Sequence, residues 1–132
     1  MIFKLAMSIH IALYRLTGGR LGGKQIVLLT TIGKKTGQRR TKPLFHIKDG
    51  ASYIVIASAG GSDTNPAWYG NLVANPSVTV EDHGRTLAGQ ASTVPPDERA
   101  RLWRQVVAAS PGFAGYESKT SRIIPLVRIT PN

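Results

Sequence analysis

The sequence contains no cysteine, which excludes disulfide bonds and metal sites built on thiolates. Acidic residues are also scarce: no aspartate or glutamate precedes Asp49, whereas ten of the seventeen lysines and arginines lie within residues 1–48. The formal net charge over 132 residues is +10. A positive charge of this size, concentrated in one part of the chain, predicts an anionic partner such as nucleic acid, an acidic lipid or an anionic ligand.

Motifs of hydrolytic and metal-dependent enzymes are missing as well. The histidines His10, His46 and His83 fall on a predicted helix, strand and hairpin turn, without the spacing of metal ligands. We therefore expect no metal site, and we interpret His46 as a hydrogen-bonded strand residue. The segment GGRLGGKQ, residues 18–25, resembles a phosphate-binding loop, but no serine or threonine follows Lys24 and a predicted helix precedes the segment. It is interpreted as a turn.

The N-terminal segment lacks the length and apolarity of a membrane-spanning helix, and no clear signal-peptide cleavage site follows it. Residues 2–16 instead predict a retained amphipathic helix. Its apolar stripe consists of Ile2, Leu5, Ile9, Leu13 and Leu16. We expect this stripe to pack on the protein's own core. Binding of the helix to an anionic membrane surface is the alternative.

The rest of the sequence predicts strands joined by hairpins, with few helices. The predicted strands are residues 25–32, 41–48, 52–58, 77–81, 85–94 and 123–129. Helices are expected from Pro66 to Ala74 and from Pro95 to about Ala109, and a loop or short helix over residues 110–121. This order predicts an α+β fold, a small antiparallel β-barrel of about six strands with flanking helices, as a single domain over residues 1–132.

The segment GKKTGQRR, residues 33–40, places four basic residues between two predicted strands. Gly33 and Gly37 would allow backbone N–H groups to converge on one anion. Lysine and arginine side chains would add charge-assisted hydrogen bonds to phosphate or carboxylate. A solvated hairpin tip is the alternative interpretation of this turn.

A second segment, SAGGSDTNPAWYGNL at residues 58–72, has the composition of a ligand-binding wall. A serine at a strand end is followed by two glycines and then by Trp68 and Tyr69 on a predicted short helix. Aromatic residues beside a basic turn suit a flat ring with an anionic tail. They would also suit single-stranded nucleic acid, so these residues alone leave both partners open.

Six segments in this order resemble the deazaflavin-dependent nitroreductase and quinone reductase family, whose members use coenzyme F420 on a split β-barrel and are typical of actinobacteria. The segments are LTGGRLGG, LLTTIGKKTGQRRTKPL, DGASYIVIASAGG, NPAWYGNLVANPSVTV, DERARLW and TSRIIPLVRITP. The resemblance implies an F420H2-dependent reductase that transfers hydride to a small hydrophobic organic acceptor, for which a quinone is one candidate. The alternatives are a protein that uses FMN, one that binds F420 without turnover, and a basic nucleic-acid-binding barrel.

The resemblance also implies which residues form the site. F420 is a polyanion attached to a flat ring, and the basic turn is expected to face its phosphate or tail carboxylates. The implied cofactor-binding residues are Lys34, Lys35, Thr36, Arg40, Lys42, Pro43, Phe45, Ser58, Pro66, Ala67, Trp68 and Asn71. Ser58 is expected beside the reactive face of the ring.

The acceptor side departs from the family pattern. Where related reductases place three tyrosines over the substrate, this chain has Ser110, Phe113 and Tyr116, so Ser58 and Tyr116 are the expected catalytic residues. Ala59 stands where a lysine often helps to hold the phosphate. The implied location is cytoplasmic, with peripheral contact to the inner face of the plasma membrane as an addition, and the oligomeric state stays open.

Overall fold

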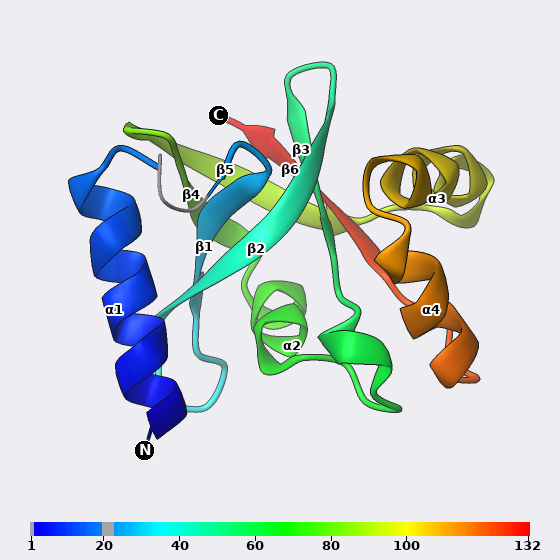
Figure 1. Ribbon diagram of the computed structural model, residues 1–132, viewed down its shortest axis with the longest axis horizontal. Helices are drawn as coiled ribbons and strands as arrows, with labels where there is room; N and C mark the ends of the chain where they lie inside the picture. Colours follow the sequence, from blue (N-terminus) through cyan, green and yellow to red (C-terminus); the bar gives the residue numbers. More distant parts are fainter. Residues whose placement is uncertain (1, 20–22) are drawn as a thin grey trace.

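The computed structural model describes residues 2–19 and 23–132, with side chains described from residue 7 onward. Its six strands form one closed antiparallel barrel in the order β1-β2-β3-β6-β5-β4 (Figure 1). The strands are β1 (Ile26–Ile32), β2 (Arg39–Asp49), β3 (Ser52–Ile56), β4 (Ser77–Asp82), β5 (Arg85–Thr93) and β6 (Leu126–Pro131). The predicted α+β barrel is therefore confirmed. The middle of the glycine-rich segment 18–25, with Arg20, lies outside the described residues.

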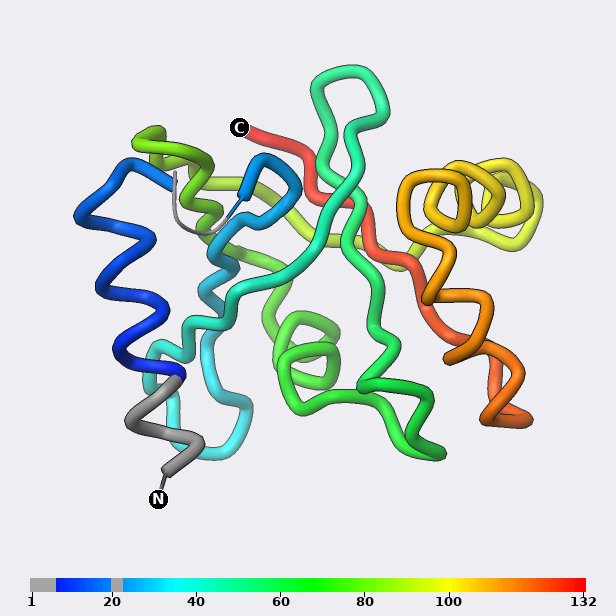
Figure 2. Tube along the Cα trace, in the orientation of Figure 1, coloured from blue at the N-terminus to red at the C-terminus, as the bar shows by residue number. Residues whose placement is uncertain are grey.

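Helices surround the barrel on different sides (Figures 1 and 2). They are α1 (Ile2–Leu16), α2 (Ala67–Ala74), α3 (Pro96–Ala109) and α4 (Gly112–Lys119), with a single 3₁₀ turn, η2 (Ala59–Gly61), after β3. Helix α1 stands on one side of the barrel, and α3 and α4 stand on the other. Helix α2 contributes Trp68 and Leu72 to the apolar cluster inside the barrel and so closes one end of it.

Two apolar clusters stabilise this arrangement. Strand side chains alternate between the two faces of a sheet, so Tyr53 and Val55 of β3 point into the barrel whereas Ile54 and Ile56 point outward. The outward residues pack under α3 and α4, where Trp103 and Phe113 cover them. The barrel and its helical layer therefore share β3 as a common wall.

Strand β2 is paired unevenly along its length. It pairs with β1 from Ile26↔Phe45 to Ile32↔Arg39, but with β3 only from His46↔Val55 to Asp49↔Ser52. Pro43 lies in the half of β2 that pairs on one side only, which is where a residue without a backbone N–H is tolerated in a sheet. The same half carries the basic residues of the predicted site.

Some predicted boundaries are wrong by a few residues. The last strand begins at Leu126 and not at residue 123, because Ile124 packs under the helical layer and its carbonyl accepts two hydrogen bonds from the Arg99 guanidinium. The third strand ends at Ile56. Pro66 caps α2 with extended backbone angles and is not its first helical residue.

The orientation of α1 also differs from the prediction, although its bounds agree. Ile9, Leu13 and Leu16 of the predicted stripe are 51%, 41% and 82% exposed, so the expectation that they pack on the core is wrong. The side chains of Ile2 and Leu5 lie outside the described residues. Among the described side chains of this helix, residues 7–16, Tyr14 is the buried one, at 1% exposure.

Polar contacts explain this orientation. The Tyr14 hydroxyl donates to the carbonyl of Ile26 at 2.9 Å and accepts from the His83 backbone N–H at 3.0 Å. On the next residue, the Arg15 guanidinium forms two hydrogen bonds with the Glu81 carboxylate, at 2.8 and 2.9 Å. Together these contacts hold α1 against the start of β1 and the β4–β5 hairpin. Ile9, Leu13 and Leu16 are left facing outward.

His83, at the tip of the β4–β5 hairpin, has an oxygen acceptor at each ring nitrogen. Nδ1 lies 2.6 Å from the Asp82 carboxylate and Nε2 lies 2.9 Å from the Gly23 carbonyl. Both nitrogens must carry a hydrogen to satisfy these contacts, so the hydrogen bond with Asp82 raises the pKa of His83. His46 differs, because burial lowers its pKa. The Nδ1 atom of His46 lies 2.9 Å from the Gln25 carbonyl. His46 is thus the hydrogen-bonded strand residue that we predicted.

We expect the stability of the protein to decline above pH 6.5 because of His83. A raised pKa in the folded state means that the stabilisation is complete below the unfolded pKa of about 6.5 and is lost as the pH rises through the folded value. Urea unfolding should show a loss of about 0.5–1 kcal/mol between pH 6.5 and 8.5, the scale of a partly exposed ion pair. His83→Asn should remove this slope, since asparagine tolerates the left-handed backbone of this position (φ 51°). Equal slopes in both proteins would contradict the assignment.

Candidate functional site

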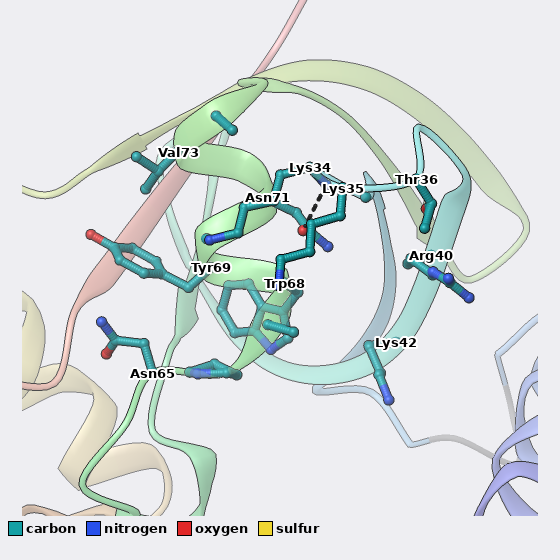
Figure 3. A pocket seen from close by; sticks show the side chains of 15 residues that line it. Lys34, Lys35, Thr36, Arg40, Lys42, Asn65, Trp68, Tyr69, Asn71 and Val73 are labelled. Carbon is teal, nitrogen blue, oxygen red and sulfur yellow. Dashed lines mark hydrogen bonds between the residues drawn. The ribbon is translucent and has the colours of Figure 1, made fainter.

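A cavity of about 850 Å³ opens between the turn after β1, strand β2 and helix α2 (Figure 3). Its volume is within the range of cofactor and ligand sites. Among the residues predicted for the cofactor site, it brings together Lys34, Lys35, Thr36, Arg40, Lys42, Pro66, Ala67, Trp68 and Asn71. Residues from three separate segments of the chain therefore meet where the sequence predicted a single site.

The turn between β1 and β2 is closed by its own hydrogen bonds. The Gly33 N–H donates to the Gln38 carbonyl and the Gly37 N–H to the Gly33 carbonyl, both at 2.8 Å, while the Gln38 N–H donates to the Thr36 hydroxyl. A Cβ on Gly33 would lie 2.8 Å from the Thr36 hydroxyl, and Gly37 has φ of 71°, so both glycines are required by this fold. The predicted nest is wrong for these N–H groups, because each already has an acceptor. The side chains of the turn remain available for an anion.

Asn71 of α2 connects the turn to the end of the barrel. Its Oδ1 accepts from the backbone N–H of Lys34 at 3.1 Å, and its Nδ2 donates to the Thr31 hydroxyl at 3.3 Å. Both Asn71 and Thr31 are buried. The contact with Lys34 is drawn as a dashed line in Figure 3. Asn71 therefore determines where the basic turn is placed relative to the helix.

The cavity collects positive charge that the protein does not neutralise. Lys34 and Lys35 come from the turn, and Arg40 and Lys42 come from β2 (Figure 3). Within residues 2–19 and 23–132, none of these four side chains forms an ion pair; the bridges found there involve Arg15, His83, Arg101 and Arg128. Four cations at one cavity without carboxylate partners give it a positive potential, which favours an anionic ligand.

The aromatic residues at the cavity differ in role. Trp68 lines the cavity but is only 7% exposed, because its ring also belongs to the apolar cluster inside the barrel. Tyr69 points away from the turn in Figure 3, and its hydroxyl lies 2.8 Å from the Thr93 hydroxyl. Trp68 thus gives the cavity an apolar surface beside the basic side chains.

Three predicted cofactor residues and Tyr116 do not line this cavity. Pro43 lies on β2, and Phe45 packs outside the barrel against Phe113, with ring centroids 5.2 Å apart. Phe113 in turn contacts Tyr116 edge to face at 5.6 Å. These rings form an apolar wall between β2 and α4.

Ser58 follows β3, directly before η2, and does not line the cavity. The residue is 9% exposed and its hydroxyl reaches solvent, because no fully buried side-chain oxygen of the described residues lacks a hydrogen-bond partner. Its carbonyl accepts a hydrogen bond of 2.8 Å from the Arg122 guanidinium. Sequence reasoning missed Arg122, and its only signal there is an arginine isolated between Ser121 and a run of apolar residues.

A model of the F420H(2)-dependent quinone reductase family matches residues 6–131 of the chain. The chain belongs to this family. Membership confirms the resemblance found in the sequence, the assignment as an F420H2-dependent reductase, and F420 as the cofactor. It gives no support to FMN.

Relatives of the quinone reductase family agree with this assignment. The F420H(2)-dependent quinone reductase Rv1261c of Mycobacterium tuberculosis is 39% identical over 132 residues, which span 94% of this chain and 89% of that protein. A solved F420-H2 dependent reductase (FDR-A) is 38% identical with a TM-score of 0.74, covering 80% of this chain and 94% of its own. A further structure, described as a domain-swapped dimer, is 32% identical with a TM-score of 0.77 and covers 98% of this chain and 99% of its own.

Proposed function

We propose that this reductase binds the anionic part of F420 in the basic cavity and passes hydride from F420H2 to a small organic acceptor, with a quinone as the acceptor class. The observation that carries the proposal is the group of four unneutralised cations around one cavity. Arg40 can offer two parallel hydrogen bonds to a phosphate or carboxylate, and Lys34, Lys35 and Lys42 add further positive charge around the cavity. The residues present therefore fit the proposed cofactor.

The proposed chemistry needs little proton transfer from the protein. When bound, reduced F420 supplies a hydride, which with one proton converts a quinone to its hydroquinone. The residues of this chain then have to orient the ring and exclude water. We place Ser58 between the basic cavity and the wall of Phe45, Phe113 and Tyr116, because its loop lines the cavity at Asn65 and contacts α4 through η2. This wall is apolar, as a quinone site requires, and Tyr116 provides its one phenol.

The first test is a comparison of cofactors. We expect F420 to bind more tightly than FMN, because only F420 carries a long polyanionic tail to match the four cations. Fluorescence titration of the purified protein with both compounds would measure the two dissociation constants, and steady-state oxidation of F420H2 with menadione would measure turnover. Equal or tighter binding of FMN would contradict the proposal. Tight F420 binding without turnover would support a binding protein instead.

We also propose weak attachment of α1 to anionic membranes. No helix in the described residues is long and apolar enough to cross a bilayer. However, the exposed Ile9, Leu13 and Leu16 form an outward apolar stripe, which is the property that an interfacial helix needs. One similar solved structure is described as a domain-swapped dimer. A second copy of this chain is therefore the alternative partner for the exposed stripe.

Full-length protein should therefore pellet with vesicles containing phosphatidylglycerol at low salt. The double substitution Leu13→Ser and Leu16→Ser should abolish pelleting without unfolding the protein, because both side chains are largely exposed. Ile123→Ser is the matched control, since Ile123 is an isoleucine 76% exposed on the segment before β6. If the wild-type protein stays in the supernatant, the proposed membrane attachment is wrong. Light scattering would then show whether the chain is a dimer.

A further inference from the structure

Arg122, which follows α4, forms hydrogen bonds with both ends of the loop between β3 and α2. Its Nη1 donates to the Ala57 carbonyl at 3.3 Å and its Nη2 to the Ser58 carbonyl at 2.8 Å. Its Nε donates to the Ser62 carbonyl, and Nη1 also donates to the Asn65 side-chain oxygen, both at 2.8 Å. One guanidinium group thus contacts the loop at four places.

The loop that Arg122 holds has an unusual backbone. Three successive residues, Ala59, Gly60 and Gly61, have φ of 47°, 64° and 86°. L-residues rarely adopt this left-handed region, so Ala59 is strained, and such strain persists only where surrounding contacts enforce it. A Cβ on Gly61 would lie 2.9 Å from the Tyr116 carbonyl, so the loop is also pressed against α4.

The charge of Arg122 is not used for an ion pair. Asp63 belongs to the same loop, yet its carboxylate accepts from the Thr120 hydroxyl at 3.2 Å, and no carboxylate of the described residues pairs with Arg122. All the contacts of the guanidinium go to oxygens of the loop. This arrangement is typical of an arginine that fixes a backbone conformation.

The loop connects the two halves of the proposed site. Asn65 lines the basic cavity, whereas Ser58 at the other end of the loop does not, and η2, which follows Ser58, contacts α4. We propose that Arg122 is a positioning residue, which holds residues 57–65 so that Ser58 keeps a fixed place relative to the cavity. This inference rests on the proposed function, because it assigns Arg122 a role in that reaction.

Arg122→Lys tests the inference, since lysine keeps the charge but cannot form the four-point contact. Arg101→Lys is the matched control, because Arg101 contacts Asp49 and no residue of the loop. The first readout is hydrogen exchange of the cofactor-free proteins. The second is the dissociation constant of F420 together with kcat and KM for menadione reduction.

We expect exchange in residues 57–65 of Arg122→Lys to rise at least tenfold, while the strands of the barrel keep their wild-type exchange. The F420 dissociation constant should change less than threefold, because the four cations are untouched, and kcat should fall at least tenfold. Arg101→Lys should match the wild type in every measurement. A merely structural role would change exchange throughout the fold and would lower kcat only in proportion to the folded fraction.

Unchanged exchange in residues 57–65, or a kcat within twofold of the wild type, would overturn the inference. Failure of the proposed function has a different signature, because the wild-type protein itself would then fail to bind F420 or fail to oxidise F420H2. In that case the exchange measurement still decides whether Arg122 holds the loop. Arg122→Gln, which removes the charge as well, should behave like Arg122→Lys if geometry and not charge is responsible.

Discussion

Arg40→Ala should weaken the binding of F420 by about 1.5–3 kcal/mol, or roughly 10- to 150-fold in the dissociation constant, which is the scale of a hydrogen bond to a charged group. Arg40 lies in β2 opposite Thr31 and lines the cavity, where it is not paired with a carboxylate of the described residues. Its loss removes the only guanidinium among the four cations. The loss should shrink in high salt, because screening already weakens the wild-type contact.

Arg39→Ala provides a matched control for this measurement. Arg39 is the neighbouring residue on β2 and is equally exposed, but it does not line the cavity because successive strand residues point to opposite faces. It should change the dissociation constant by less than threefold. If Arg40→Ala binds F420 like the wild type at low salt, the segment GKKTGQRR returns to its alternative interpretation as a solvated hairpin tip.

Local patterns predicted the elements of this fold well, because each strand and helix carries its own signal. The buried run of β1, the Asp49–Gly50 hairpin and the acidic first turn of α3 all lie where the sequence placed them. Closure of the barrel is different, because the pairs β1–β4, β3–β6 and β5–β6 join strands that are far apart in the sequence. Boundaries failed where a distant contact decided them, as at Ile124, whose carbonyl is occupied by Arg99.

The orientation of α1 shows the limit of hydrophobic periodicity. The stripe containing Ile9, Leu13 and Leu16 is regular, yet Tyr14 is the residue that faces the barrel. The Tyr14 hydroxyl forms hydrogen bonds with two backbone groups, and Arg15 pairs with Glu81. These contacts determine which side of the helix faces the barrel, and they leave three aliphatic side chains exposed. These partners lie far along the chain, so no local pattern contains them.

The site was predicted in two different ways. Its residues came from family resemblance, and the structure gathers the basic ones and those of α2 around one cavity. The local argument for a backbone nest failed for Gly33, Gly37 and Gln38, because their N–H groups close the turn itself. Arg122 was missed because its partners lie 57 to 65 residues away. A residue that acts by holding a loop leaves no motif in the sequence.

Asn71 gives the second large expected effect, because it joins the turn, β1 and α2. Asn71→Leu keeps a similar volume but leaves two polar groups without their partner, the buried Thr31 hydroxyl and the Lys34 N–H. Each unsatisfied group costs about 1–3 kcal/mol, so urea unfolding should show a loss of about 2–6 kcal/mol for the two groups together. The rest of α2 should stay in place, since Trp68 and Leu72 still pack inside the barrel.

Binding of F420 should respond to Asn71→Leu even where the protein remains folded. Without the contact to Asn71, Lys34 and Lys35 are no longer held over α2, and the anion must order the turn as it binds, which costs conformational entropy. We expect the dissociation constant to rise more than tenfold at 15 °C in the absence of urea. Asn75→Leu is the control on the same helix, because Asn75 caps its C-terminal end and does not line the cavity. Wild-type affinity in a destabilised Asn71→Leu protein would show that the turn finds its place without α2.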